Sequence, residues 1–401
     1  MQRFDARESH GPCAGFRVLD FTNTVSGPMC SQYLGDLGAD VVKVEPPDPG
    51  DASRATGQPF PDGMTGLFLQ LNRNKRSIVI DLRNERGREV ARRLARGSDV
   101  VVTNYRPGVA ERIGIGYERL SEENPRLVYV AITGFGPDGP YAHLPAYDHL
   151  IQGLSGMMPV QGAGGPPKMM QSVVVDKCSG LVGGGAALAA LLARERNGGL
   201  GQRVDVPMLD AYAAYMAPEL LSPHAFPQEK PQRSPTGQVF RTWETRDGFV
   251  VGIAVLDAQF AALCRALERE DLLEVERFAR MSERFRHVGE LYPILETEFR
   301  KWSTDEIVER ARRFGAPFGP VHAFEDFLAD PQVAHNRTVF EAPGPGGDPA
   351  RYLTHPARFS RSPAGMRRAP PRLAEHSDEI LREAGYSGEE IEALRGAGAI
   401  A

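Results

Sequence analysis

Short, almost entirely apolar segments alternate with helical ones over the first third of the chain. Five apolar segments are rich in β-branched residues and bounded by polar or turn-forming residues, which predicts strands at Gly15–Phe21, Asp40–Glu45, Ser77–Leu82, Asp99–Asn104 and Leu127–Thr133. Helices are predicted from Pro28 to Leu37 and from about Glu85 to Ala95, each followed by a glycine that ends it. Apolar strands separated by helices are typical of a parallel sheet covered on both faces. We therefore predict a Rossmann-like α/β domain.

A proline-rich segment marks a change of pattern in the second half of the chain. Ser222–Thr236 holds four prolines and is predicted to be a linker. After it, Val239–Ala254 has the pattern of a hairpin with Asp247 and Gly248 in the turn, and amphipathic helices follow up to about Phe314. This pattern predicts a smaller α+β domain.

Two capping boxes indicate where helices begin in the last hundred residues. Ser303 is followed three residues later by Glu306, and Ser387 by Glu390. In a capping box the serine hydroxyl and the glutamate carboxylate each accept a hydrogen bond from a backbone N–H at the helix start. The chain is therefore expected to return to helical structure near its C-terminus.

Composition limits the class of protein. The 401 residues exceed what one hydrophobic core usually supports, and 41% apolar with 25% charged residues is ordinary for a globular chain. The longest nearly unbroken apolar run, Leu181–Ala193, is too short to span a bilayer, and residues 1–10 lack the apolar segment of a secretory signal. A net charge of −5 argues against a general nucleic-acid binder, and four cysteines without a CxxC pair indicate neither a disulfide framework nor a zinc site. We expect a cytoplasmic protein with no metal, membrane or nucleic-acid partner.

Common cofactor and catalytic motifs are absent. The loop after the first predicted strand holds only Gly27, whereas a dinucleotide site needs G-x-G-x-x-G. Glu45 could act as a ribose-binding acid at the end of the second strand, although a solvated carboxylate is the commoner interpretation. There is no Walker A loop, HExxH or G-x-S-x-G, and His143 and His149 have no third metal ligand nearby.

Basic and polar side chains gather near the predicted strand ends. They are Asn74-Lys75-Arg76, Arg83, Asn104 to Gly108, and Arg112. Ligands of open α/β sheets bind outside the carboxyl ends of the strands, and guanidinium groups fit phosphate oxygens. These residues are either a phosphate-binding set or ordinary surface cations.

Asp176 is the strongest candidate for chemistry. It follows a strand-like run, Gln171–Val175, and begins a Gly/Ala-rich helix. An aspartate at that place is most often an N-cap. However, a carboxylate with an ordinary pKa of about 3.9 is ionised at neutral pH and needs no base to become a nucleophile.

The sequence resembles the family III CoA-transferases, which include formyl-CoA and carnitine CoA-transferases and related 2-methylacyl-CoA racemases. The segments that carry the resemblance are VLDFTNTVSGP, LGDLGADVVKVEPP, NRNKRSIVIDL, DVVVTNYRPGVAERIG, ITGFGPDGPY and SVVVDKCSG. The resemblance implies a large Rossmann-like domain made from both chain ends, a small central domain and an interlocked homodimer. The segments expected on this basis are 1–221 for the first part of the large domain, 222–236 for the linker, 237–330 for the small domain, and 331–401 for the return linker and the C-terminal helices.

The resemblance also assigns residues. Asp176 matches the catalytic aspartate of the family. The positions that match residues around CoA are Thr24, Val25, Ser26, Ile80, Arg83, Asn104, Tyr105 and Arg112. An acyl-CoA thioester and a carboxylic acid would be the substrates, with no tightly bound cofactor.

The implied reaction passes CoA from a donor acid to an acceptor acid through an aspartyl-CoA thioester on Asp176. A racemase of the same family is the first alternative, but such relatives place a His-Asp pair where this chain has Tyr147 and Asp148. Tyrosine, with an ordinary pKa near 10, is a poor base at neutral pH. A non-catalytic protein that binds CoA thioesters is the second alternative.

Overall fold

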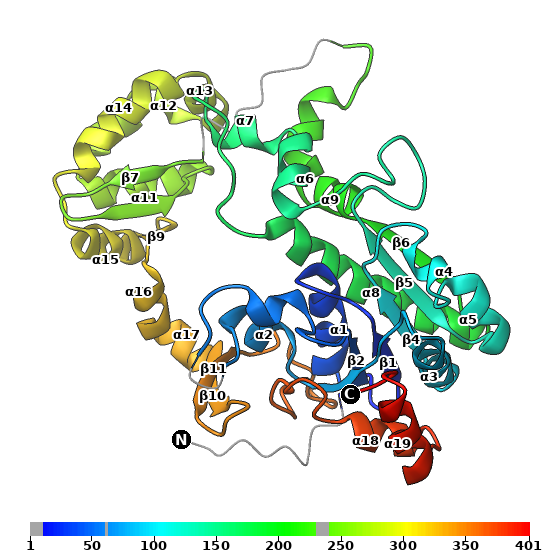
Figure 1. Cartoon of the computed structure of the whole chain (residues 1–401). Helices are drawn as coiled ribbons and strands as arrows, with labels where there is room; N and C mark the ends of the chain where they lie inside the picture. Colours follow the sequence, from blue (N-terminus) through cyan, green and yellow to red (C-terminus); the bar gives the residue numbers. More distant parts are fainter. Residues whose placement is uncertain (1–10, 61–62, 230–239) are drawn as a thin grey trace. The chain divides into compact units, whose positions relative to one another are not determined.

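The computed structural model describes residues 11–60, 63–229 and 240–401 (Figure 1). The chain forms two compact units, each assembled from segments that are distant in the sequence. Unit 1 contains residues 1–156, 169–216 and 334–401, and unit 2 contains residues 157–168 and 217–333. Residues 230–236 of the predicted linker and Val239 of the predicted hairpin lie outside the described residues.

A six-stranded parallel sheet forms the centre of unit 1. Its strands are β1 (Arg17–Asp20), β2 (Asp40–Glu45), β3 (Lys75–Val79), β4 (Val100–Thr103), β5 (Val128–Thr133) and β6 (Arg203–Pro207). They lie in the order β3-β2-β1-β4-β5-β6, with Leu19 opposite Val42 and Val101. The predicted parallel α/β sheet is confirmed.

Two details of the sheet differ from the sequence prediction. β3 begins at Lys75 rather than Ser77, because the charge of Lys75 is paired inside the protein. β6 was not predicted, because its sequence, RVDVP, carries two charged residues and is only half-buried.

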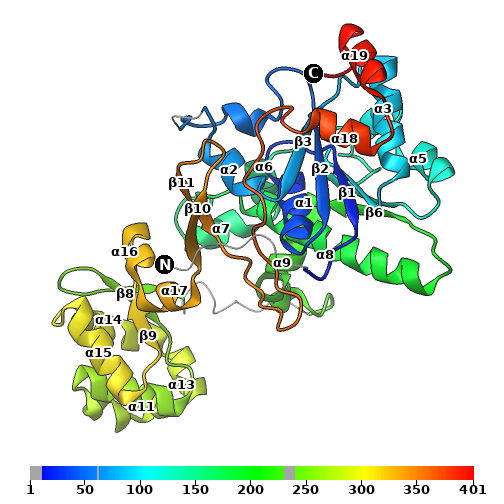
Figure 2. The same cartoon turned by 90° about the horizontal axis from the view of Figure 1, so that it is seen from below.

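Helices cover both faces of this sheet (Figure 2). One face packs against α1 (Ser26–Asp36) and α8 (Val174–Arg196). The core on the other face is built with α3 (Glu85–Arg96), α5 (Tyr117–Glu123), α18 (Ser377–Glu383) and α19 (Gly388–Gly396). The remaining elements of unit 1 are α2 (Gly66–Leu71), α4 (Val109–Arg112), α6 (Asp148–Leu154), most of α9 (Met208–Leu221), the short helix Ala52–Ala55, and the antiparallel pair β10 (Val339–Pro343) and β11 (Pro349–Leu353).

Small residues bring α8 very close to α1. A Cβ on Gly180 would lie 2.7 Å from the Ser26 carbonyl oxygen, and one on Gly184 would lie 2.7 Å from the Tyr33 ring. These glycines are four residues apart and therefore share one face of the helix. Glycine is required at position 180 by the close approach of the Ser26 backbone and at position 184 by that of the Tyr33 side chain.

α8 is also long and apolar enough, by length and composition, to cross a membrane, with a mean hydropathy of 1.3 over its best window. In unit 1 this helix packs against α1, β5 and β6. Helices in the core of folded domains commonly have the same length and composition, so this property alone does not indicate a membrane span.

Unit 2 is built from a small antiparallel sheet and several helices. Its strands are β7 (Thr242–Glu244), β8 (Phe249–Gly252) and β9 (Phe318–Pro320), in the order β7-β8-β9. Its helices are α7 (Met157–Gln161), α11 (Asp257–Leu267), α12 (Glu276–Ala279), α13 (Met281–Arg286), α14 (Val288–Phe299), α15 (Thr304–Phe314), α16 (Phe324–Ala329) and the first half of α17 (Pro331–Asn336), with short turns at Ser222–His224 and Glu270–Leu273. The hairpin around Asp247 and the capping box of Ser303 with Glu306 are confirmed.

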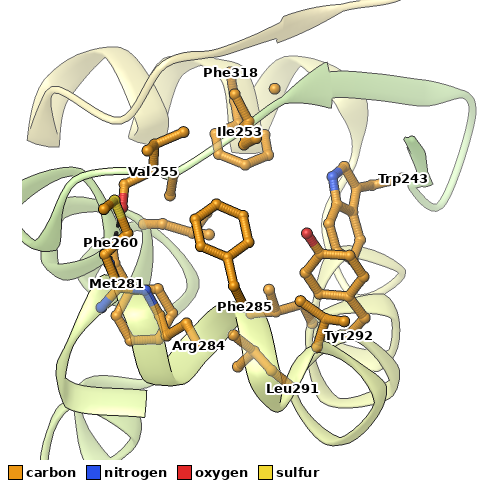
Figure 3. Close-up of a pocket in the computed structure, with 15 residues that line it drawn as sticks. Trp243, Ile253, Val255, Phe260, Met281, Arg284, Phe285, Leu291, Tyr292 and Phe318 are labelled. Atoms are coloured by element: carbon orange, nitrogen blue, oxygen red, sulfur yellow. Dashed lines mark hydrogen bonds between the residues drawn. The ribbon is translucent and has the colours of Figure 1, made fainter. Parts of the chain in front are cut away.

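The core of unit 2 contains a small cavity (Figure 3). It is lined mainly by apolar side chains, among them Trp243, Phe285, Tyr292 and Phe318, and its volume is about 40 Å³. Ligand pockets usually measure ~300–1,000 Å³. This cavity is therefore a gap in core packing and not a site for a large substrate.

Candidate functional site

The loops that follow β1 and β4 meet at the carboxyl edge of the sheet. The strand order reverses between these two neighbouring strands, which is where open α/β sheets bind their ligands. Asn104 joins the loops: its Oδ1 accepts a hydrogen bond from Asn23 N at 3.0 Å, and its Nδ2 donates to Asn23 O at 2.8 Å. The predicted residues on the two loops and the start of α1 are Thr24, Val25, Ser26, Asn104 and Tyr105.

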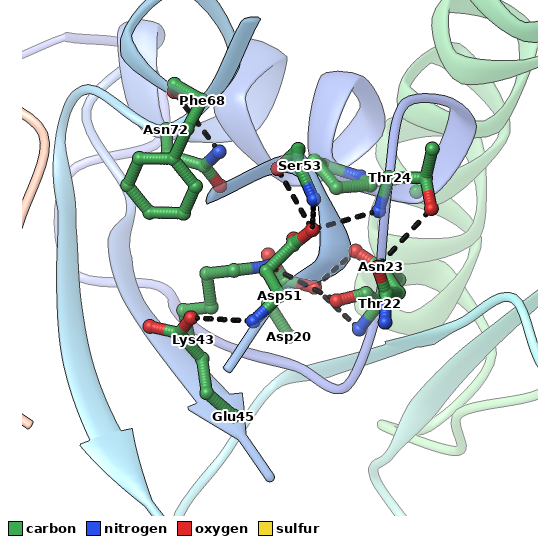
Figure 4. A network of polar contacts seen from close by, with 12 residues as sticks. Asp20, Thr22, Asn23, Thr24, Lys43, Glu45, Asp51, Ser53, Phe68 and Asn72 are labelled. Carbon is green, nitrogen blue, oxygen red and sulfur yellow. Dashed lines mark hydrogen bonds and ion pairs between the residues drawn. The ribbon is translucent and has the colours of Figure 1, made fainter. Parts of the chain in front are cut away.

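A buried acid anchors the loop after β1 (Figure 4). Asp51 Oδ1 accepts hydrogen bonds from Thr24 N at 3.0 Å and Ser53 N at 2.8 Å, and Oδ2 pairs with Lys43 Nζ at 2.7 Å. Lys43 also donates to Thr22 O at 2.9 Å. Burial would raise the pKa of Asp51, but Lys43 and these hydrogen bonds hold it below its usual range. The loop therefore rests on a fixed ion pair.

A second buried pair lies beside the first. Lys75 Nζ contacts Asp20 Oδ2 at 3.0 Å and donates to Pro28 O at 3.0 Å, and Ser31 Oγ donates to the same Asp20 oxygen at 2.6 Å. Burial would raise the pKa of Asp20, but Lys75 and Lys43 bring it down to about 2. Because Ser31 and Pro28 belong to α1, this pair links the helix to β1 and β3.

Thr24 has an unusual backbone conformation. Its φ is 71°, in the left-handed region that β-branched residues rarely adopt. The hydrogen bond from its N–H to Asp51, and one from its hydroxyl to Asn23 Oδ1 at 3.1 Å, hold the residue there. Strained residues of this kind often occur at functional sites. Thr24 is exposed, whereas Val25 and Ser26 are buried.

Asp176 lies in the first turn of α8, beside the start of α1. Residues 171–173 form bends instead of the predicted strand, so the helix begins directly after a loop. Asp176 stands one turn before Gly180, whose Cα approaches Ser26 closely. The close α1–α8 contact therefore positions the Asp176 carboxylate beside Ser26, with which it forms a hydrogen bond. The small residues Gly180, Gly183 and Gly184 that follow Asp176 serve this packing.

The surroundings of Asp176 change the pKa of its carboxyl group. The side chain is half-buried and forms no ion pair within the described residues. Burial and the nearby Asp148 carboxylate raise the pKa of Asp176 to about 6, and the Ser26 hydrogen bond opposes them. The ionised form still predominates at neutral pH.

The predicted cations fall into two groups. Lys75 and Arg76 lie at the amino end of β3 and form internal ion pairs, Arg76 with Asp40, Glu379 and Glu383, so they are not available to a phosphate. Arg83 is exposed and pairs with Asp81 at 2.9 Å. Arg112, at the end of α4, is exposed and has no ion pair in the described part of the chain.

The apolar and aromatic candidates are less accessible. Ile80 is 1% exposed and packs in the core, where its backbone forms an isolated antiparallel β-bridge with Ile400. Tyr105 is half-buried, and burial raises its pKa to about 12. Glu45 is buried, not solvated: it pairs with Arg54 at 2.7 Å and accepts a hydrogen bond from Ser77.

Sequence reasoning did not name Asp51, and it did not foresee that Asp148 binds the start of α8. Asp148 holds the backbone of Asp176, and Asp51 holds that of Thr24. Their contacts join residues 28 and 27 positions apart, so no local motif reveals them. The described residues contain no cluster of three or more side chains suited to a metal ion.

Comparison with known proteins identifies the family to which this chain belongs. Residues 13–377 match the model of CoA-transferase family III. The chain is 34% identical to the succinate–glutarate CoA-transferase of Agrobacterium fabrum, over 93% of this chain and 95% of that protein. It is 31% identical to a formyl-CoA:oxalate CoA-transferase of Escherichia coli O157:H7, over 96% and 98% of the respective chains.

Solved structures agree with these similarities. A CAIB/BAIF family protein from Brucella suis has a TM-score of 0.81 at 34% identity, over 94% of this chain and 100% of that chain. The family match and these similarities identify the chain as a CoA-transferase. The chain belongs to CoA-transferase family III, which confirms the family expected from the sequence.

Proposed function

We propose that this CoA-transferase carries CoA from an acyl-CoA donor to a carboxylic acid through covalent intermediates on Asp176. The observation that carries the proposal is the carboxylate itself: it lies in the first turn of α8, without an ion pair in the described residues, beside the loop anchored by Asp51. A carboxylate in that state is nucleophilic without a general base.

The reaction conserves the energy of the thioester bond, because each intermediate is an activated acyl derivative. Asp176 attacks the donor thioester carbonyl and expels the CoA thiolate, which leaves a mixed anhydride. The thiolate then attacks the aspartyl carbonyl, so that an aspartyl-CoA thioester forms and the donor acid leaves. An acceptor carboxylate attacks this thioester, expels the thiolate and forms a second anhydride. Attack of the thiolate on the acceptor's carbonyl gives the new acyl-CoA and restores Asp176.

The Thr24–Ser26 segment is proposed to contact CoA, together with Asn104 and Tyr105. Arg83 and Arg112 are proposed to bind its phosphates. Ile80 would contribute through its backbone, because its side chain is buried. No tightly bound cofactor takes part in this scheme.

A homodimer and a cytoplasmic location belong to the same proposal. Apolar side chains on the side of α8 away from α1 are exposed in the single chain: Leu181, Val182 and Leu192 are 46%, 42% and 53% exposed. A partner subunit would cover such a surface. The four cysteines are free thiols, as expected in a reducing compartment. We also propose the domain boundaries expected from the sequence, which lie after residues 221, 236 and 330.

Transfer can be separated from racemisation in one experiment. The names of the relatives suggest two pairs to test, succinyl-CoA with glutarate and formyl-CoA with oxalate, together with 2-methylacyl-CoA donors. In D₂O we expect the acceptor's thioester to form with no deuterium at the α-carbon, measured by mass spectrometry. Tyr147 and His149 are exposed, and their stacked rings have centroids 6.0 Å apart. Rapid enzyme-dependent deuterium uptake and loss of stereochemistry without an acceptor would overturn the proposal.

Arg112→Ala is expected to raise KM for acyl-CoA about tenfold, because a charge-assisted hydrogen bond to phosphate is lost. Arg83→Ala should act in the same direction but less strongly, since Arg83 must first give up Asp81. The measurement is KM at low and high salt, with Arg382→Ala, an exposed arginine on α18, as the control. If KM is unchanged in both variants, Arg83 and Arg112 are ordinary surface cations and do not bind the CoA phosphates.

A further inference from the structure

Two buried polar side chains of α6 hold the segment that leads to Asp176. Asp148 and Gln152 are 4% and 2% exposed and lie one helical turn apart. They are joined by a hydrogen bond of 2.6 Å from Gln152 Nε2 to Asp148 Oδ1. Neither residue belongs to the set expected to contact CoA.

The other Asp148 oxygen binds the start of α8. Asp148 Oδ2 accepts hydrogen bonds from Val175 N at 2.6 Å and Asp176 N at 3.1 Å. These N–H groups have no acceptor within their own helix, and no side chain at the N-cap residue, Val173, provides one. Asp148 is therefore the cap of α8, supplied from a different helix.

Gln152 fixes the loop before α8. Its Oε1 accepts a hydrogen bond from Met170 N at 3.0 Å, and its Nε2 donates to Ser172 O at 3.1 Å. Together the two side chains bind the backbone at four residues between 170 and 176. The position of the Asp176 carboxylate follows from these bonds on one side and from the Ser26 contact on the other.

We propose that Asp148 is a positioning residue for the transfer reaction: its buried carboxylate fixes the backbone of Asp176, and its negative charge promotes acylation of that residue. The inference rests on the proposed role of Asp176 as nucleophile. When the aspartyl anhydride or thioester forms, Asp176 loses its charge, and its repulsion with Asp148 disappears. Repulsion present only before the reaction lowers the barrier to it.

Few other charged or titratable groups face the pair. Tyr212, on α9, is buried close to Asp148, and burial followed by the Asp148 charge raises its pKa. α1 presents the Ser26 hydroxyl. On α8 itself, Lys177 donates to Ser172 Oγ and Cys178 to Ala211 O. None of these groups forms an ion pair with Asp148 or Asp176, so the repulsion between the two acids is opposed only by their hydrogen bonds.

The test compares Asp148→Asn with Gln152→Leu. Asparagine keeps one oxygen to accept from the two N–H groups but removes the charge, whereas leucine releases the loop and keeps the charge. Asp210→Asn, an exposed carboxylate in the first turn of α9, is the control for loss of one negative charge.

Two quantities are measured over pH 4–9. The first is labelling of Asp176 by a carbodiimide and an amine in the absence of substrate, followed by peptide mass spectrometry, which reports the protonated carboxyl without any need for activity. The second is the rate at which acyl-CoA converts the enzyme to its CoA thioester. Wild type should titrate near pH 6 in both.

Asp148→Asn should move both midpoints about one pH unit lower, because a like charge has been removed, and lower the limiting rate about tenfold. A lower pKa keeps Asp176 ionised to lower pH, so the acid limb of the rate moves in the same direction. Gln152→Leu should slow the reaction and leave the midpoints unchanged, and Asp210→Asn should change neither quantity.

A midpoint in Asp148→Asn equal to that of wild type would overturn the inference, as would a wild-type midpoint near the ordinary aspartate value of about 3.9. If Asp148→Asn fails to fold, a wild-type midpoint near the ordinary value still overturns the effect of the charge, and an unchanged reaction rate in Gln152→Leu overturns the positioning role. If the wild-type enzyme turns over without any covalent adduct on Asp176, the proposed function is wrong. The pH midpoints of the labelling would then still measure the effect of Asp148 on the pKa of Asp176.

Discussion

Asp176→Ala is expected to lower the rate of CoA transfer by at least about 10³-fold, because both covalent intermediates require its carboxylate. Wild-type enzyme incubated with acyl-CoA and then hydroxylamine should carry a hydroxamate at Asp176, detected by peptide mass spectrometry. The variant should still bind acyl-CoA, since the Thr24 loop and its anchor do not depend on the missing side chain.

Cys178→Ala is the matched control for this prediction. The thiol lies two residues further along α8, and burial raises its pKa, so it is protonated at neutral pH and should be dispensable. Asp176→Ala with activity within tenfold of wild type, or full loss of activity in Cys178→Ala, would contradict the assignment. If the wild-type protein and Asp176→Ala bind CoA equally well and neither transfers it, the non-catalytic alternative would be supported.

Lys75→Met is expected to lower the free energy of unfolding by about 3–5 kcal/mol, because it leaves Asp20 buried without its closest cation. Lys75 is fully buried and its ammonium contacts Asp20, Pro28 O and Asn72 Oδ1. Urea unfolding followed by circular dichroism measures the change. Acyl-CoA binding should also weaken, since the pair links α1 to the sheet beneath the loop.

A double variant separates the charge from the packing. Asp20→Asn with Lys75→Met removes both charges and should be more stable than Lys75→Met alone. Arg351→Met, at the exposed pair with Glu341, should change stability by less than about 1 kcal/mol. If the change in Lys75→Met falls in that same range, the buried pair does not stabilise the link between α1 and the sheet as described.

Local patterns in the sequence were sufficient for much of the fold. β-branched segments ended by turn residues predicted five strands of the parallel sheet, and the serine–glutamate capping boxes at Ser303 and Ser387 predicted helix starts that the structure contains. Each of these signals is contained in a few consecutive residues. The strand predicted at Gln171–Val175 failed because the same apolar residues also suit the first turn of a buried helix, and periodicity does not distinguish short runs.

The candidate site depends on contacts that no short pattern contains. Asn104 meets Asn23 across 81 residues, Lys75 meets Asp20 across 55, and Asp148 meets Asp176 across 28. Composition cannot tell a buried cation from a surface one, and so Lys75 and Arg76 were grouped with Arg83 and Arg112. Only the resemblance to the family directed attention to Asp176, Thr24 and Ser26 together.

The glycine face of α8 limits how the substrate specificity of such an enzyme can change in evolution or by design. Because α8 approaches the Ser26 backbone at Gly180 and the Tyr33 ring at Gly184, tight packing fixes the position of Asp176 relative to the start of α1. A new acid cannot be accommodated by shifting one relative to the other. Divergence in substrate choice within this architecture must therefore come from the walls around that tightly packed contact, and redesign of specificity should begin there, with residues 26–36 and 174–187 left untouched.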